Sequence, residues 1–232
     1  MKKHIPNALT CGNLFAGCIG IVFAFKDQLE ITAYAVLISG IFDFFDGFAA
    51  RLLNVKSPIG KELDSLADMV SFGFLPGVVL FSLLSSSDST SEYLPYAGFI
   101  ITIFSALRLA KFNIDTRQTE DFIGLNTPMN TLFIISLPFL QKDYPQLIGS
   151  AWILIVVTLV MSWLLISEIK IFSLKFSSFA WSANKIKFIF LIISLLLVIL
   201  LQFAAIPLIL ILYIGLSFLY FKKSETNQLS KS

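Results

Sequence analysis

Four aspartates in the N-terminal third of the sequence stand in two pairs with helical spacing. Asp43 and Asp46 are three residues apart, and Asp64 and Asp68 are four apart. Either spacing puts both members of a pair on one face of an α-helix. Carboxylate oxygens held on helices suit hard divalent cations such as Mg²⁺ or Mn²⁺, which keep coordination positions open for phosphate. The pattern therefore predicts a divalent-ion site that can also hold a phosphate.

Basic and glycine residues accompany the four aspartates. Carboxylates gathered in an apolar wall need protons or cations among them. Arg51, Lys56 and Lys61 could supply that charge in a purely structural ion-pair network. Gly47 and Gly60 favour a ligand site instead, because a glycine beside the acids lets a bulky ligand or another backbone approach closely.

The segments that carry these aspartates belong to a membrane protein. Of the 232 residues, 56% are hydrophobic and only 14% are charged, whereas a soluble domain usually has about 25% charged residues. A membrane span needs roughly 20 mostly apolar residues. The predicted fold class is therefore all-α, a polytopic membrane bundle in one domain. Apolar windows between polar breakers predict eight transmembrane helices, over residues 8–26, 31–53, 61–85, 93–113, 127–141, 147–168, 185–202 and 204–221.

Basic residues predict how this bundle is oriented. If the eight helices alternate, all but two of the 17 Lys and Arg fall on one side, and only Lys26 and Lys142 fall on the other. The positive-inside rule then places both termini and the aspartates at the cytoplasmic face. We expect an integral protein of a prokaryotic inner membrane. Gly12, Gly17 and Gly20 would allow close helix packing, which suggests a homodimer face on the first helix.

The aspartate region resembles a known signature. At all eight fixed positions it is similar to the signature of the CDP-alcohol phosphotransferases, as Asp43-x2-Asp46-Gly47-x2-Ala50-Arg51-x8-Gly60-x3-Asp64-x3-Asp68. In that family the four aspartates hold one or two divalent ions, Mg²⁺ or Mn²⁺, on the CDP diphosphate, and the last is proposed as the base. The resemblance also implies a six-helix catalytic core, here residues 1–168, with residues 185–221 as an added helical hairpin.

Carried over position by position, the resemblance implies roles for the matched residues. Asp68 would be both a metal ligand and the proton acceptor. Asn7 and Thr10 resemble the Asn-x-x-Thr that lines the cytidine end of the family's site, although both could simply cap the first helix. The residues expected to bind CDP-diacylglycerol are Asn7, Thr10, Asn13, Gly47, Arg51, Ser57 and Gly60.

Three later segments resemble the serine-transferring branch of the family. They are residues 71–76, 108–113 and 122–128, similar to Ser-Phe-Gly-x-x-Pro, Arg-Leu-Ala-Arg-Phe-Asn and Phe-x-Gly-Leu-Pro-x-Pro. Lys111 stands where Arg is usual, and Asn126 stands where Pro is usual. The resemblance implies transfer of the phosphatidyl group from CDP-diacylglycerol to L-serine, giving phosphatidylserine and CMP.

Serine would bring a carboxylate into the site, and a carboxylate pairs best with a guanidinium or an ammonium group. Arg108, Lys111 and Arg117 lie at the predicted cytoplasmic face and are the candidates. We expect Arg108 to be the main partner because it is deepest in its helix. All three could instead be positive-inside anchors without a substrate role.

Two other functions stay open at this point. An acceptor such as glycerol 3-phosphate or inositol phosphate would carry a phosphate, and a deeper basic cluster would be expected for it. A cation transporter would need polar residues along the length of its helices, whereas these four acids crowd one end. The partners expected are the lipid bilayer and the two substrates, and no nucleic acid.

Overall fold

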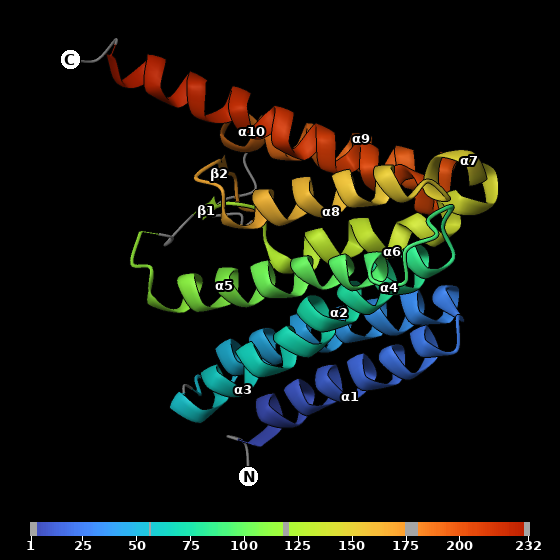
Figure 1. Ribbon diagram of the computed structural model, residues 1–232. Helices are drawn as coiled ribbons and strands as arrows, with labels where there is room; N and C mark the ends of the chain where they lie inside the picture. The colour runs from blue at the N-terminus through green and yellow to red at the C-terminus, as the bar shows by residue number, and fades with distance from the viewer. Residues whose placement is uncertain (1–3, 56, 118–120, 175–180, 230–232) are drawn as a thin grey trace.

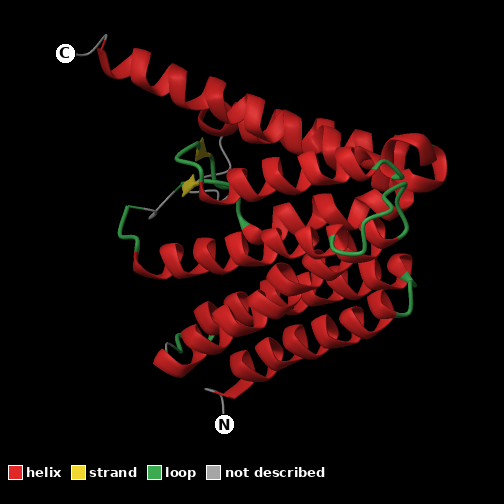
Figure 2. Ribbon diagram, viewed as in Figure 1, coloured by secondary structure: helices red, strands yellow, loops and turns green. Residues whose placement is uncertain are grey.

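The protein, as a computed structural model, is a bundle of helices with two very short strands (Figures 1 and 2). The structure describes residues 4–55, 57–117, 121–174 and 181–229. In chain order the elements are α1 (Ile5–Phe25), α2 (Leu29–Leu52), α3 (Pro58–Asp68), the π-helical turn η2 (Met69–Phe74), α4 (Leu75–Ser85), the 3-10 turn η3 (Leu94–Phe99), α5 (Ile100–Ile114), β1 (Phe122–Ile123), α6 (Thr127–Asp143), α7 (Pro145–Ile148), α8 (Ala151–Ile166), β2 (Lys170–Ile171), α9 (Trp181–Leu201), the 3-10 turn η4 (Gln202–Ala204) and α10 (Ala205–Leu229).

Helices lie at all eight places where the sequence predicts them, and the all-α class is confirmed. The boundaries differ by a few residues. The first helix begins at Ile5 rather than at residue 8, because Pro6 is tolerated in the first helical turn. Asn7 and Thr10 therefore lie inside α1, and the alternative that they cap it is wrong. The predicted break near Gln202 is also present, where η4 separates α9 from α10.

Five helical stretches are long and apolar enough to cross a membrane: Ile5–Phe25, Leu29–Leu52, Pro58–Ser85, Leu94–Ile114 and Asn184–Lys222. The last has 39 residues, about twice what one crossing needs, and η4 divides it. The two remaining segments, α6 and α8, are 17 and 16 residues long. The protein is thus a polytopic membrane bundle, and eight crossings with cytoplasmic termini stay a prediction.

The N-terminal helices pack on one another through small residues. A Cβ added at Gly17 would overlap the Ser71 side chain of η2, and one at Gly20 would meet Leu75 of α4. A Cβ at Gly12 would meet the ring of Phe42 in α2. These glycines therefore serve packing within one chain, and they carry no argument for a dimer face.

The C-terminal part of the bundle covers the other side of α5 and α6. Helix α8 packs along α5, and α10 packs against α9, α6 and β2. The loop before α6 is tied down by the antiparallel pair β1–β2, in which Phe122 is opposite Ile171. Helix α1 begins and α10 ends at the same end of the bundle (Figure 1), which is also where α2 ends and α3 begins.

Candidate active site

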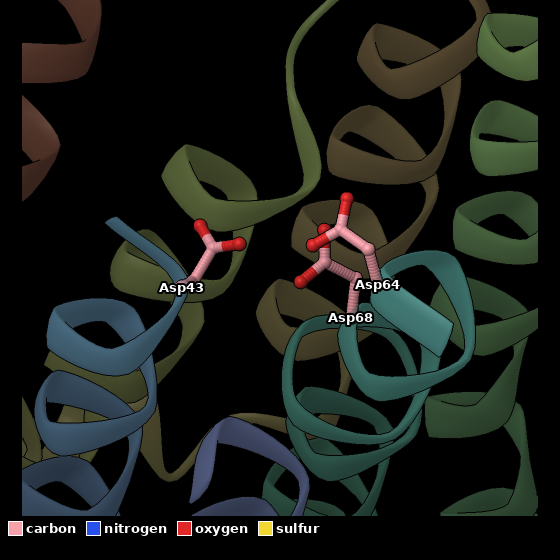
Figure 3. Close-up of side chains that lie close together, drawn as sticks. All are labelled: Asp43, Asp64 and Asp68. Carbon is pink, nitrogen blue, oxygen red and sulfur yellow. The ribbon is translucent and has the colours of Figure 1, made fainter. Parts of the chain in front are cut away.

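Three of the four aspartates converge between two antiparallel helices. Asp43 projects from α2, while Asp64 and Asp68 project from α3 toward the same space (Figure 3). One carboxylate oxygen of each lies within 4.8 Å of the others. The turn of chain after Asp68 is the π-helix η2, a wide turn that is frequent at functional sites.

The fourth aspartate is held apart from this group. Asp46 is 6% exposed, and its Oδ2 accepts a hydrogen bond of 2.6 Å from the Thr10 hydroxyl. Thr10 also donates to the carbonyl of Pro6 in its own helix. The structure therefore gathers Asp43, Asp64 and Asp68 as one possible ligand set and places Asp46 beside it, fixed to α1.

Asn13 lies behind the aspartates rather than in an open cavity. Its side chain is fully buried, and its Nδ2 donates to Oδ1 of Asp68 at 3.2 Å. Its carbonyl accepts hydrogen bonds from the hydroxyls of Ser39 and Ser71, both at 3.1 Å. One residue of α1 thus contacts α2, α3 and η2. Asn13 is not among the residues that line the cavity described below, and its contact with CDP-diacylglycerol stays a prediction.

The ligand set fits a divalent cation by its chemistry. Three carboxylates with oxygens this close repel one another unless a cation or protons lie among them. Throughout the ranges that the structure describes, no Lys or Arg forms an ion pair with any of the four aspartates. The alternative of a structural network with Arg51 and Lys61 therefore finds no support, and Lys56 lies outside the described residues.

A cavity of about 510 Å³ opens on one side of the aspartates, and we name it the donor cavity. Most of the residues predicted to bind the nucleotide line this cavity. Arg51 is not among its lining residues, and it lies exposed in the last turn of α2. Lys61 does line it, which sequence reasoning missed, although its spacing of three from Asp64 indicates the same helix face. The donor cavity is lined by Pro6, Asn7, Thr10, Asp46, Gly47, Ala50, Val55, Ser57, Pro58, Gly60, Lys61 and Asp64.

A smaller cavity of about 260 Å³ opens on the other side, and we name it the acceptor cavity. Asp68 and Arg108 both line it, so a carboxylate and a cation face the same space. Arg108 is 4% exposed, its Nε donates to the carbonyl of Leu125 at 3.3 Å, and its guanidinium lies over the Phe112 ring. The acceptor cavity is lined by Asp68, Arg108, Leu109, Phe112, Phe122, Asn126, Thr127 and Pro128.

Lys111 and Arg117, the other two cations predicted to contact serine, lie outside this lining. Lys111 forms an exposed ion pair with Glu168 at 3.5 Å. Arg117 pairs with Asp115 at 2.9 Å and with Glu168 at 3.4 Å, and its hydrogen bond to Asp115 raises the pKa of the guanidinium. Of the three candidates, only Arg108 is positioned beside the aspartates.

The unusual residue at position 126 has a local explanation. Asn126 is the N-cap of α6, and its Oδ1 accepts a hydrogen bond of 2.8 Å from the backbone N–H of Met129. Asparagine is among the best N-cap residues. It therefore stabilises the start of α6, where Thr127 and Pro128 line the acceptor cavity.

Comparison with known proteins decides the family. The family model for CDP-alcohol phosphatidyltransferases matches residues 3–164, which is more than half of the chain. The chain belongs to this family. Among its relatives is the CDP-diacylglycerol–serine O-phosphatidyltransferase of Bacillus subtilis, 33% identical over 173 residues, which are 72% of this chain and 89% of the relative.

Two further relatives match over less of their own length. The protein of the same name from Helicobacter pylori strain J99 is 34% identical over 147 residues, 62% of this chain and 61% of the relative. The archaetidylserine synthase of Methanothermobacter thermautotrophicus is 29% identical over 160 residues, 68% of this chain and 66% of the relative. The predicted resemblance to the family and to its serine branch is thus confirmed. Because the family model ends at residue 164, α9 and α10 lie outside it.

Proposed function

We propose that the protein transfers the phosphatidyl group of CDP-diacylglycerol to the hydroxyl of L-serine, giving phosphatidylserine and CMP. The observation that carries this proposal is the acceptor cavity, in which the buried cation of Arg108 and the carboxylate of Asp68 face one space beside the clustered aspartates. The names of the Bacillus subtilis and Helicobacter pylori relatives support serine as the acceptor.

The donor would bind with its nucleotide in the donor cavity. Asn7 and Thr10 from α1, and Gly47 from α2, line that cavity. Among the described residues, no atom outside its own helix backbone lies within 4 Å of where a Cβ of Gly47 would be, so its backbone leaves room for a ligand. Ser57 and Gly60 form the first turn of α3, where the Ser57 hydroxyl accepts the N–H of Gly60 at 2.9 Å. Arg51 would reach the nucleotide from the rim.

Asp43, Asp64 and Asp68 would hold one or two Mg²⁺ or Mn²⁺ ions, with Asp46 beside them. When bound, such an ion supplies a positive charge that polarises phosphoryl oxygens and stabilises the leaving CMP. The residues themselves would hold the diphosphate next to the acceptor cavity and exclude water from it. Phe112, Phe122 and Leu109 provide apolar walls there.

Serine would bind in the acceptor cavity with its carboxylate on the guanidinium of Arg108. Asp68 takes the proton of the serine hydroxyl. The oxygen forms a bond to the phosphorus that carries diacylglycerol, and the bond from that phosphorus to CMP breaks. Asn13 keeps the Asp68 carboxylate oriented, because its amide donates a hydrogen bond to one of the two carboxylate oxygens.

We place the protein in a prokaryotic inner membrane, with the aspartate end at the cytoplasmic face and residues 1–168 as the catalytic core. The acyl chains of the donor then stay in the bilayer while its head group reaches the aspartates. The positive-inside distribution of Lys and Arg supports this orientation.

The test is acceptor-dependent release of CMP from the full chain purified in detergent. CDP-diacylglycerol is supplied with Mg²⁺ or Mn²⁺, and L-serine, glycerol 3-phosphate and inositol phosphate are compared. Release should require serine and metal and should be lost in Asp68→Asn. Release with another acceptor alone would replace serine in this proposal, and no release from folded protein would overturn it.

A further inference from the structure

Lys61 lies on the helix face that carries the catalytic aspartates. It precedes Asp64 by three residues and Asp68 by seven, and these spacings put all three on one side of α3. Its side chain is exposed and lines the donor cavity. Its Nζ donates a hydrogen bond of 3.1 Å to the backbone carbonyl of Asn113 at the end of α5.

The described residues that line the donor cavity carry little positive charge. Its lining includes the carboxylates of Asp46 and Asp64, and Lys61 is the single cation among the described residues that line it. In that same part of the chain Lys61 forms no ion pair. A carbonyl oxygen is a weaker partner for an ammonium than an anionic oxygen is. The ammonium of Lys61 should therefore bind an anionic ligand more strongly than it binds the carbonyl of Asn113.

We infer that Lys61 binds the diphosphate of the donor from the same side of α3 that carries Asp64. This inference rests on the proposed function, since it assumes that the donor cavity receives a nucleoside diphosphate. Lysine has a flexible four-carbon stem and a compact charge, so its Nζ can leave the Asn113 carbonyl for a phosphoryl oxygen without a helix movement.

A simpler role for Lys61 would be to fasten α3 to α5. A second hydrogen bond joins the same two helices, from Nδ2 of Asn113 to the hydroxyl of Ser65 at 2.8 Å. Ser65→Ala removes that bond and leaves the ammonium of Lys61 in place. It is therefore the matched control for a fastening role, because it loosens the same contact without changing the charge of the cavity.

Direct binding measurements separate these roles and do not depend on turnover. Radiolabelled CDP is bound to the detergent-solubilised full chain with Mn²⁺ present, and unlabelled CDP and cytidine are used as competitors. Lys61→Met should weaken CDP binding roughly tenfold, the scale of a lost hydrogen bond to a charged group at a partly exposed site, while cytidine changes less than about twofold. Lys61→Arg should recover most of the CDP affinity, and Ser65→Ala should bind CDP like the wild type.

Three results would overturn the inference alone. The first two are Lys61→Met binding CDP as tightly as the wild type and Ser65→Ala losing as much CDP affinity as Lys61→Met. An equal loss for CDP and cytidine would also overturn it, because the ammonium would then not act on phosphate. A folded wild type that binds no CDP would overturn the proposed function, and CMP release with serine tests that function separately.

Discussion

The two cavities beside the aspartates are built from very different stretches of chain. Every described residue that lines the donor cavity falls between Pro6 and Asp64, on α1, α2, α3 and the short link between α2 and α3. The acceptor cavity joins Asp68 of α3 to α5, to the loop before α6 and to α6 itself. One cavity is thus a product of neighbouring helices, and the other needs a loop to be held in place across the bundle.

The way that loop is held explains the difference. Gly124 has a φ of +75°, a conformation that residues with a Cβ adopt only at a cost. Its N–H donates to the carbonyl of Ile169 at 2.8 Å, and a Cβ there would lie 2.8 Å from the carbonyl oxygens of Leu165 and Ser167. Next to this glycine, the carbonyl of Leu125 accepts a hydrogen bond from Nε of Arg108. The acceptor cavity therefore depends on contacts with the C-terminal half, and the donor cavity does not.

Removal of divalent metal should have the largest effect, because the aspartates stand between both cavities. Chelation with EDTA should lower CMP release by at least about 100-fold, since metal ions contribute several kcal/mol to charge stabilisation in such reactions. Re-addition of Mn²⁺ or Mg²⁺ should restore the rate. Full activity in the chelated protein would mean that Asp43, Asp64 and Asp68 do not act as metal ligands.

Substitution of Arg108 should weaken binding in the acceptor cavity and leave binding in the donor cavity nearly unchanged. Arg108→Met should raise the KM for serine by about 10- to 100-fold, the scale of a lost hydrogen-bonded charge partner, and should leave the KM for CDP-diacylglycerol within about twofold. Steady-state kinetics with each substrate varied in turn would measure this. Lys111→Met is the control, because its exposed pair with Glu168 lies outside the acceptor cavity; an equal effect there would contradict a specific role for Arg108.

Substitution of Asn13 should lower turnover with little effect on binding in either cavity. Asn13→Leu removes the hydrogen bond that orients Asp68, and we expect kcat to fall about tenfold with both KM values nearly unchanged. Asn130→Leu is a matched control. That asparagine is also fully buried, in α6, and its amide has no hydrogen-bond partner among the described residues. A similar loss of kcat in both variants would indicate a general packing defect.

The smallest effect should come from the cap of α6 at the edge of the acceptor cavity. Asn126→Ala should destabilise the protein by about 1 kcal/mol, the usual contribution of an N-cap side chain. Asn126→Asp keeps an oxygen that can accept the N–H of Met129 and should cost little. Thermal unfolding in detergent would compare the two variants, and equal melting temperatures for Asn126→Ala and the wild type would show that the cap is not needed.

The sequence by itself determined the class, the helices and the helix faces that bring three aspartates together. Apolar windows predicted the helical segments because a bilayer requires long uninterrupted helices with internally paired backbones. The spacing of four residues predicted that Asp64 and Asp68 share one face of a helix. The short link between α2 and α3 predicted that this helix lies beside the one that carries Asp43. Such features are local, and helical periodicity is enough to resolve them.

Only the tertiary structure decided how individual side chains are divided among roles. It separated Asp46 from the other aspartates through Thr10, moved Asn13 behind Asp68, and placed Lys61 rather than Arg51 in the donor-cavity lining. It also brought Arg108 beside Asp68, 40 positions earlier in the chain. The physical reason is that helix spacing fixes the face on which a residue lies, whereas its partner depends on which distant helix or loop packs against that face.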